Sequence, residues 1–207
     1  MKSTFAIFDV DYTIIKGDSM FLMLIFGIKK RPLIIFYTPI ILVKIVLALL
    51  GIIDIRVAKE AIYIPLKFLT EKELEGFYNE VLLNNLNIEV MKRLKRHKEE
   101  GHHILLASAS PEAYLSWFKK NNYIDGIIGT KIKKIDDKYI NEIEGENCKG
   151  GEKLKRINQY LEERNLEIDF ENSFAYSDSL GDKPMLSLVK NRYKVSKTQG
   201  IIGEFIW

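Results

Sequence analysis

Short apolar runs alternate along this chain with longer stretches in which apolar residues recur every three or four positions. Runs of strand length begin at Phe5, Ile104, Ile127 and Phe174, and a fifth covers residues 193–195. The stretches between them have the spacing of amphipathic helices. Strands that alternate with helices favour a parallel sheet with helices on both faces. The pattern therefore predicts an α/β fold of three layers.

Boundary signals place the connecting elements. Thr70 followed by Glu73 is a capping-box pattern that opens a helix. Ser110-Pro111 predicts the N-cap and the first residue of another helix, which runs to about residue 121. Further along the chain we expect a surface hairpin over residues 131–143, a helix over 152–164, and a tail over 200–207 with exposed apolar residues.

The most apolar stretch follows the first strand. Residues 33–53 run for 21 positions with few polar interruptions, which is long enough for a transmembrane helix. Topology argues against a simple span, because residues 5–13 and 103–195 are expected to share one domain. The next segment, residues 54–69, carries too many charges to cross back.

Two interpretations of residues 20–53 remain open. They form a helical hairpin in the membrane surface, with Lys29-Lys30-Arg31 at the headgroups, or an apolar lid that packs on itself or on a second copy of the chain. In either case, we expect residues 16–87 to form a helical cap. The cap is inserted into a core made of residues 1–15 and 88–207.

Composition excludes some partners. The chain has 207 residues, 29% of them charged, and a net charge of +3 without a basic arm, so we expect no nucleic acid. Its single cysteine, Cys148, excludes an intramolecular disulfide and fits a reducing compartment. Because the first strand begins at Phe5, we expect no cleavable signal peptide and a cytoplasmic protein.

Polar groups follow three of the predicted strands. Asp9 and Asp11 come at the end of the first strand, Ser108 ends the second, and Asp178 ends the fourth, with Asp182 four residues later. A buried strand has no structural need of a carboxylate at its end. Because the carboxyl ends of parallel strands meet at one edge of the sheet, we expect these side chains to converge there.

The chemistry of this set suits phosphoryl transfer. Carboxylates held together attract a cation, and an oxygen-only set suits Mg²⁺ better than zinc. Two carboxylates one residue apart can divide the roles of nucleophile and proton shuttle. Ser108 and Lys153, which lies in the first turn of a helix, can donate to phosphate oxygens. For His97, His102 and His103 we expect a solvated or structural role.

Together these motifs resemble those of the haloacid dehalogenase-like phosphatases, in the same order: Asp9-Val10-Asp11-Tyr12-Thr13, then Ser108, then Lys153, then residues 178–182. The resemblance implies a Rossmann-like core, with Asp9 as the nucleophile that becomes an aspartyl-phosphate and Asp11 as the general acid/base. It also implies that Mg²⁺ is bound by the carboxylates of Asp9 and Asp178 and the main-chain carbonyl of Asp11. Supporting roles are implied for Thr13, Ala109 and Asp182.

At two positions the comparison with this family is not straightforward. Tyr12 stands where many members of the family have glycine, which alters the turn after the nucleophile. Lys149 lies one turn before Lys153 and competes with it for the phosphate-binding role, although the spacing of Gly151, Glu152 and Lys153 favours the latter.

The place of the insertion is similar to that in the phosphoserine-phosphatase-like branch. Within it, the basic turn before the apolar run and residues 176–182 look most like the bacterial phosphatidylglycerophosphate phosphatases. The resemblance implies a lipid phosphate as substrate and a peripheral position on the inner face of the cell membrane. The alternatives are a phosphatase of a soluble metabolite such as phosphoserine, and a non-catalytic, membrane-attached binding module.

Overall fold

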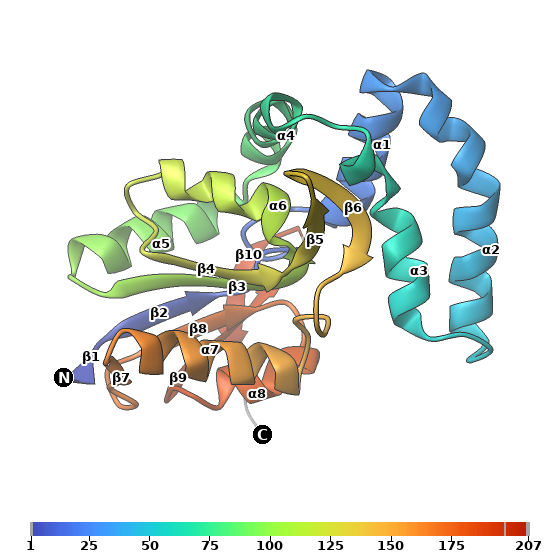
Figure 1. The fold of residues 1–207 in the computed structure, drawn as a ribbon. Helices are drawn as coiled ribbons and strands as arrows, with labels where there is room; N and C mark the ends of the chain where they lie inside the picture. The colour runs from blue at the N-terminus through green and yellow to red at the C-terminus, as the bar shows by residue number, and fades with distance from the viewer. Residues whose placement is uncertain (1, 197, 206–207) are drawn as a thin grey trace.

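A six-stranded sheet forms the centre of the computed structural model, which describes residues 2–196 and 198–205 (Figure 1). Its spatial order is β10 (Gly200–Glu204), β9 (Asn191–Ser196), β8 (Phe174–Ser177), β2 (Phe5–Phe8), β3 (His103–Pro111) and β4 (Gly126–Thr130). All neighbouring pairs are parallel except β10 and β9. The predicted α/β fold with a parallel sheet is confirmed, and β2 lies at its centre.

Helices cover both faces of this sheet (Figure 1). One face carries α5 (Ile88–Glu99), α6 (Glu112–Leu115) and the 3-10 helix Ser116–Lys120, and the other carries α7 (Gly151–Glu163) and α8 (Lys183–Leu186). Side chains alternate between faces along a strand. Accordingly, Ala6 and Phe8 belong to the apolar cluster under α5, whereas Phe5 and Ile7 belong to the cluster under α7.

Two small sheets complete the core. The pair β1 (Lys2–Ser3) and β7 (Glu167–Ile168) is parallel, and β5 (Ile132–Ile135) with β6 (Lys138–Ile143) forms the predicted hairpin. Both turn residues of this hairpin, Asp136 and Asp137, have positive φ angles of 48° and 60°. A two-residue turn of that kind matches the twist of the strands, and Asp tolerates it better than most residues.

The insertion, residues 16–87, is helical. It contains α1 (Ser19–Lys30), the 3-10 helix Pro32–Tyr37, α2 (Thr38–Leu49), α3 (Ile55–Ile62), the 3-10 helix Ile64–Lys67, α4 (Glu71–Phe77), the π-helix Tyr78–Leu82 and the 3-10 helix Leu83–Asn85. Helices α1, α2 and α3 lie beside the sheet, with α2 outermost (Figure 1). The predicted capping box of α4 is confirmed, since Glu73 N donates to Thr70 Oγ1 and Thr70 N donates to Glu73 Oε2.

Close packing joins α1 to the segment after α3. A Cβ placed on Gly27 would lie 2.5 Å from the Cβ of Pro65, so only glycine permits this approach. Apolar residues of the insertion, including Met23, Phe26 and Phe77, also enter the same buried cluster as Phe8 of the sheet. The insertion and one face of the sheet therefore share a continuous apolar core.

Two boundaries differ from those expected. Strand β3 continues to Pro111, which becomes the N-cap of α6 instead of its first residue, and α6 gives way after Leu115 to a 3-10 helix. The predicted tail is wrong over Gly200–Glu204, because this segment pairs with β9 as strand β10. Residues 206 and 207 of that tail lie outside the described residues.

Candidate active site

Asp9 forms a buried ion pair with Lys153 at the carboxyl edge of β2. Its backbone N donates to Tyr176 O at 2.9 Å, and Lys153 Nζ donates to its Oδ1 at 2.9 Å. Lys153 is the third residue of α7 and is 2% exposed, and its Nζ also lies 2.6 Å from Asp182 Oδ1. Ser177 Oγ donates to the other oxygen of Asp182 at 2.7 Å. The structure thus brings together three of the predicted site residues.

Burial and the neighbouring charges together set the pKa values of this pair. It raises the pKa of Asp9, against the opposing effect of the Lys153 ammonium, and the carboxylates of Asp182 and Asp11 raise it further. Burial alone would lower the pKa of Lys153, but Asp9 and Asp182 outweigh it and hold that pKa above its usual value. Lys153 therefore stays charged at neutral pH.

Asp11 is bound by three donors from two segments of the chain. Ser110 Oγ donates to Asp11 Oδ2 at 2.5 Å and Ser108 Oγ donates to the same oxygen at 3.4 Å. The backbone N of Ser19, the first residue of α1, donates to Asp11 Oδ1 at 2.7 Å. The carboxylate of Asp11 is therefore oriented jointly by β3 and by the insertion.

A bulge in β3 presents these serines. The pairing of β3 with β4 shifts register between Ala107 and Pro111, so the strand segment with Ser108 and Ser110 bends out of the ladder. Ser110 N donates to Ser108 Oγ at 3.0 Å, and Thr130 Oγ1 donates to Ala109 O at 2.7 Å. These bonds hold the bulge, which directs two hydroxyl groups toward Asp11.

The loop after Asp9 contains a tyrosine in the left-handed region. Tyr12 has a φ of 57°, a conformation that glycine adopts without strain and that costs another residue about 1 kcal/mol. This is the physical reason why glycine suits the position. Thr13 is fully buried and its Oγ1 donates to Asp9 Oδ2 at 3.4 Å. The predicted supporting position of Thr13 therefore has a contact in the structure.

Asp178 and Lys149 lie at the margin of the cluster. Asp178 follows β8, is half-buried, and lies close enough to Tyr12 to help raise the pKa of that phenol, after burial and the carboxylates of Asp18 and Asp11. Lys149 is exposed and precedes α7. Because Lys153 is the residue that contacts Asp9, the geometry favours Lys153 over Lys149 as the phosphate-binding lysine.

A second lysine approaches the site from the insertion. Lys59 Nζ, on α3, donates to Asn147 Oδ1 at 3.0 Å. Burial, together with the neighbouring ammonium of Lys149, lowers the pKa of Lys59 to about 8, although the carboxylates of Asp11 and Asp18 oppose this. Lys59 is therefore a cation held between the insertion and the carboxylates.

The charges around Asp9 fit a divalent cation. The carboxylates of Asp11 and Asp182 both act on Asp9, and Lys153 is the only cation among the groups that influence Asp9 most strongly. The excess of negative charge, carried by oxygen atoms, is the kind of site that Mg²⁺ occupies. A second set of possible metal ligands lies at the opposite edge of the sheet, where β3 begins. There, ligand atoms of His97, Glu100 and His102 lie within 4.8 Å of one another.

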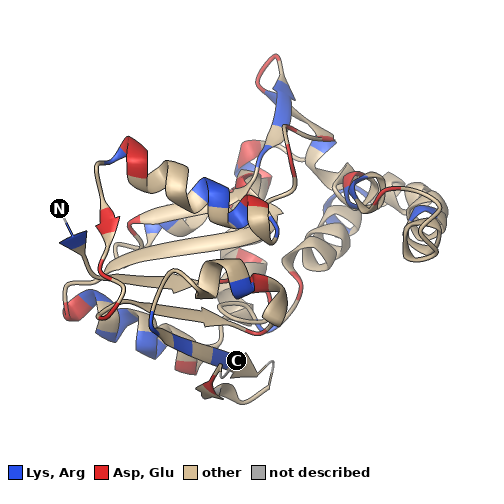
Figure 2. Ribbon diagram, turned by 90° about the horizontal axis from the view of Figure 1, so that it is seen from below, with Lys and Arg blue, Asp and Glu red and all other residues tan. Residues whose placement is uncertain are grey.

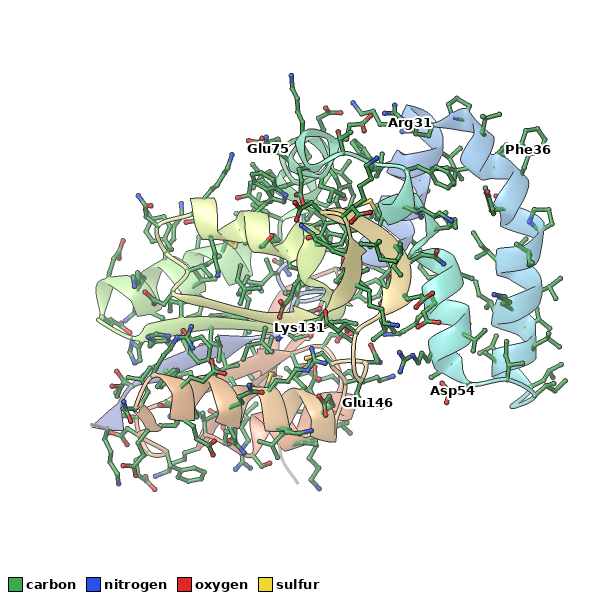
Figure 3. The ribbon with its side chains drawn as sticks, in the orientation of Figure 1. Arg31, Phe36, Asp54, Glu75, Lys131 and Glu146 are labelled. Carbon is green, nitrogen blue, oxygen red and sulfur yellow. The ribbon has the colours of Figure 1, made fainter. Side chains whose placement is uncertain are left out.

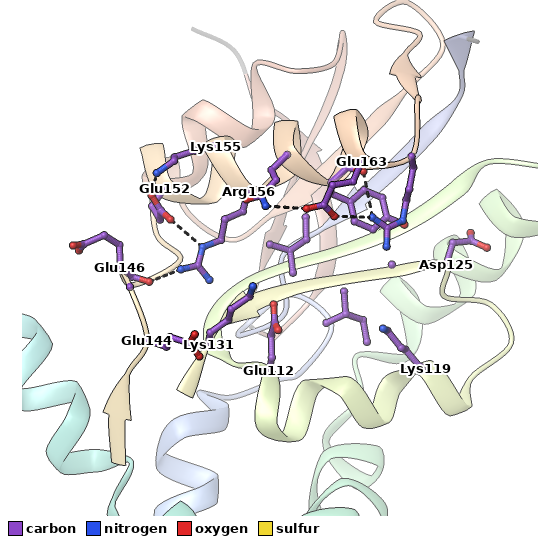
Figure 4. A pocket seen from close by; sticks show the side chains of 17 residues that line it. Glu112, Lys119, Asp125, Lys131, Glu144, Glu146, Glu152, Lys155, Arg156 and Glu163 are labelled. Atoms are coloured by element: carbon purple, nitrogen blue, oxygen red, sulfur yellow. Dashed lines mark hydrogen bonds and ion pairs between the residues drawn. The ribbon is translucent and has the colours of Figure 1, made fainter. Parts of the chain in front are cut away.

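A separate groove of about 470 Å³ lies between α6 and α7 at the edge strand β4 (Figure 4). Its polar side chains bind one another and the backbone. Arg156, for example, donates to Glu152 Oε1 at 3.0 Å and to the carbonyls of Gly129 and Glu146 at 2.6 Å each. The groove contains none of the predicted site residues, and its arginines are bound to neighbouring carboxylates and carbonyls, so we look for the chemistry at Asp9.

A comparison of the sequence with protein families decides the family of the chain. The profile of the haloacid dehalogenase-like hydrolases matches residues 6–187, which is most of the sequence. The chain belongs to the haloacid dehalogenase-like hydrolases. This confirms the predicted family, and the matched segment contains every predicted site residue, from Asp9 to Asp182.

Several known proteins are similar to this chain in sequence or in fold. Phosphoserine phosphatase SerB1 of Mycobacterium tuberculosis is 25% identical over 115 residues, which are 56% of this chain and 37% of that protein. A solved structure of a Bordetella pertussis protein has a TM-score of 0.80 at 21% identity and covers 94% of this chain and 90% of its own. A phosphoserine phosphatase, solved as an analogue of its phospho-aspartyl intermediate, has a TM-score of 0.63 at 16% identity, with coverage of 94% and 87%.

These similarities support the family of the chain but not a narrower group within it. The chain spans little more than a third of the length of the curated relative, and the solved structures share its fold. The narrower resemblance to phosphatidylglycerophosphate phosphatases stays a prediction, since the relatives found here include phosphoserine phosphatases.

Sequence reasoning missed several polar residues of this hydrolase site. Ser19 Oγ donates to Ser110 Oγ at 3.0 Å and lies 3.1 Å from the hydroxyl of Tyr114. Asp18-Ser19 before an apolar run is an N-cap pattern, and Asp18 does cap α1, so this signal could have placed Ser19 in the first turn of a helix. No comparable sequence signal identifies Lys59, because its approach depends on how α3 packs.

Proposed function

We propose that this chain is a Mg²⁺-dependent phosphomonoesterase that acts through an aspartyl-phosphate on Asp9. The observation that carries the proposal is the buried carboxylate of Asp9, bound to Lys153 at 2.9 Å, with the second carboxylate of Asp11 two residues away and held by separate donors. A binding module would gain nothing from two strand-end carboxylates that destabilise each other.

The two oxygens of Asp9 have different surroundings. Oδ1 accepts from Lys153, while Oδ2 has a long contact of 3.4 Å with Thr13. The less restrained Oδ2 attacks phosphorus, the bond from phosphorus to the ester oxygen breaks, and Asp11 gives its proton to the leaving alcohol. Asp11 then takes a proton from the water that attacks the aspartyl-phosphate. This releases inorganic phosphate and restores both aspartates.

Donors around the site bind the phosphate oxygens. Lys153, from α7, and the hydroxyl of Ser108, from β3, supply a charged and a neutral donor. Bound Mg²⁺, held by the carboxylates of Asp9 and Asp178 and the carbonyl of Asp11, would neutralise phosphate charge. Asp182 keeps Lys153 in place at 2.6 Å.

Hydrolysis of p-nitrophenyl phosphate, with and without Mg²⁺, tests this proposal. We expect the intact chain to be active and Asp9→Asn to be inactive but folded, because the amide is a far weaker nucleophile. Acid quenching should trap a phosphorylated protein that Asp9→Asn does not form. Asp11→Asn should lose most activity on alkyl phosphates and least on phenyl phosphates, whose leaving groups need no proton. An intact chain without any Mg²⁺-dependent hydrolysis would instead be a binding module.

The substrate class that the relatives favour is a small soluble phosphomonoester such as phosphoserine. A second candidate, a lipid phosphate, is favoured by one observation on this chain: the apolar side chains that the insertion exposes, among them Leu33, Phe36 and Leu49. A phosphate-release screen with phosphoserine and lipid phosphates, run with and without detergent, separates the two. Turnover of phosphoserine alone would exclude the lipid assignment.

A further inference from the structure

The insertion exposes an unusual number of large apolar side chains on one outer surface. Between residues 33 and 55, twelve of them are at least 40% exposed: Leu33, Ile35, Phe36, Tyr37, Ile40, Leu42, Val43, Val46, Leu49, Leu50, Ile52 and Ile55. We call these residues the outer face. In Figure 3, Phe36 points away from the rest of the molecule at the outer side of the insertion. Soluble surfaces rarely carry apolar patches of this extent without a partner.

Only one side of α2 is covered by the rest of the chain. Ile41 is 2% exposed and packs with Leu24, Ile34 and Ile62, so this side faces α1 and α3. The opposite side carries Val43 and Val46, and Leu49 is exposed at the end of the helix. Of the segment Pro32–Leu49, which is apolar and long enough to be a candidate membrane span, 11% is buried. The uncovered half of α2 therefore has no partner within the described chain.

The geometry fits a helix that lies in a membrane surface. The segment Pro32–Leu49 is divided into a 3-10 helix and the 12-residue helix α2. Twelve helical residues extend about 18 Å, whereas the hydrocarbon core is about 30 Å thick. Both ends of α2 also return to helices that pack on the same molecule, α1 and α3. Contact along the length of α2 is therefore favoured over a crossing.

The charge of this region favours an anionic surface. Residues 16–69 contain eight Lys and Arg but three Asp and Glu, a net charge of +5, while the whole chain has +3, so the remainder has −2. Residues 70–87 add one Lys and four Glu, so the whole insertion has a net charge of +2 and its positive excess lies in residues 16–69. Figure 2 shows that the outermost helices of the insertion are largely uncharged. Arg31 and Lys30 pair with Glu73 and Glu80, but Lys29 and Lys44 have no ion pair within the described residues. Like charge on two copies opposes self-association through this face.

We propose that the outer face docks the protein on the surface of a bilayer that contains anionic lipids. The apolar side chains enter the boundary between headgroups and acyl chains, and Lys29 and Lys44 approach the lipid phosphates. The proposal does not depend on the reaction at Asp9.

Flotation of the full chain with vesicles tests the docking surface. We compare vesicles of phosphatidylcholine with vesicles of phosphatidylcholine and phosphatidylglycerol in equal amounts. The protein should float with the mixed vesicles and bind the neutral ones more weakly. Lys29→Gln with Lys44→Gln should raise the half-maximal lipid concentration by about fivefold for each removed charge. The matched control, Lys138→Gln with Lys155→Gln, changes exposed lysines outside the insertion and should bind as the unmodified chain does.

The apolar contact needs its own pair of variants. Val43→Gln, Val46→Gln and Leu49→Gln together should abolish flotation. The control combines Ile88→Gln, Ile135→Gln and Phe170→Gln, which are at least 44% exposed elsewhere, and should retain it. Hydrolysis of p-nitrophenyl phosphate should be unchanged in both. Hydrogen exchange of the unmodified chain needs no substitution and should show vesicle protection over residues 32–53 and none over α7.

Several outcomes would overturn the proposal. One is a chain that stays at the bottom of the gradient with mixed vesicles, and another is an outer-face variant that floats as well as the unmodified chain. A third is a dimer, seen by light scattering, that the outer-face variant dissociates while flotation is absent. In that case the occupant of the outer face is a second copy.

Discussion

Replacing Lys153 by methionine should destabilise the fold strongly, because it removes the cation between two buried carboxylates. Lys153 Nζ lies 2.9 Å from Asp9 Oδ1 and 2.6 Å from Asp182 Oδ1. The three residues are 2%, 6% and 7% exposed, so water cannot replace the ammonium. Methionine fills nearly the same space, which separates the loss of charge from the creation of a cavity.

The expected size follows from the burial. Removing one partner of a buried ion pair costs about 3–5 kcal/mol, because the remaining charge is left without compensation. A domain of this size has roughly 5–15 kcal/mol of stability in total. The second substitution Asp182→Asn, added to Lys153→Met, should recover part of the loss, since one of the two uncompensated carboxylates is then neutral.

Urea denaturation at pH 7, followed by far-UV circular dichroism, measures the effect. The control is Lys155→Met on the same helix, whose side chain is 76% exposed and should change the free energy of unfolding by less than about 0.5 kcal/mol. In Lys153→Met the pKa of Asp9, which burial already raises, loses the opposing effect of the ammonium, so the destabilisation should shrink as pH falls and Asp9 takes up a proton. A loss below about 1 kcal/mol would show that Lys153 does not compensate Asp9, contrary to our reasoning.

Three further predictions concern other parts of the molecule. Tyr12→Gly should be more stable than Tyr12→Ala by about 1 kcal/mol in urea denaturation, because φ is 57° and both variants lose the ring. Burial lowers the pKa of His97 to about 4, so the unfolded chain takes up its proton first as pH falls. Stability should therefore drop between about pH 6.5 and 4 by up to about 3 kcal/mol, and His97→Gln should flatten that slope. Lys59→Gln should raise KM more for phosphomonoesters with an anionic leaving group than for p-nitrophenyl phosphate, because it removes a cation beside Asp11. Equal effects on both substrates would place Lys59 outside the leaving-group site.

Most of the core could be predicted because local and tertiary preferences agree there. The runs that begin at Phe5, Ile104 and Phe174 are apolar on both faces, as central parallel strands require, and their residues are buried as expected except Phe174, which is half-buried. The polar residues at their ends are informative for the same reason, since nothing in strand packing accounts for Asp9 or Asp178. Helical phase then places Lys153 in α7 against Asp9.

The remaining features depend on tertiary contacts that no local pattern encodes. Ser110-Pro111 has the sequence of a helix start, but the hydrogen bond from Ser110 to Asp11 and the bulge after Ala107 keep the chain in β3 for longer. Strand β10 forms because β9 offers an unpaired edge, which residues 200–204 alone do not reveal. The contact of Lys59 with Asn147 likewise needs the packing of α3 against the segment after β6.

The insertion has a polar surface that contacts the core and an apolar surface that faces outward, and α3 lies between them. On the side toward the sheet, Arg56 donates to the carbonyls of Ile143 and Gly145, and Glu60 accepts from the backbone N of Ile143. These bonds tie α3 to the end of β6, a few residues before α7 and its Lys153. On its other side α3 packs on α2, whose far half is apolar and exposed. One short helix therefore lies between the outer face and the segment that positions the ion pair with Asp9. An insertion that served only to cover a polar substrate would need the first of these surfaces and not the second.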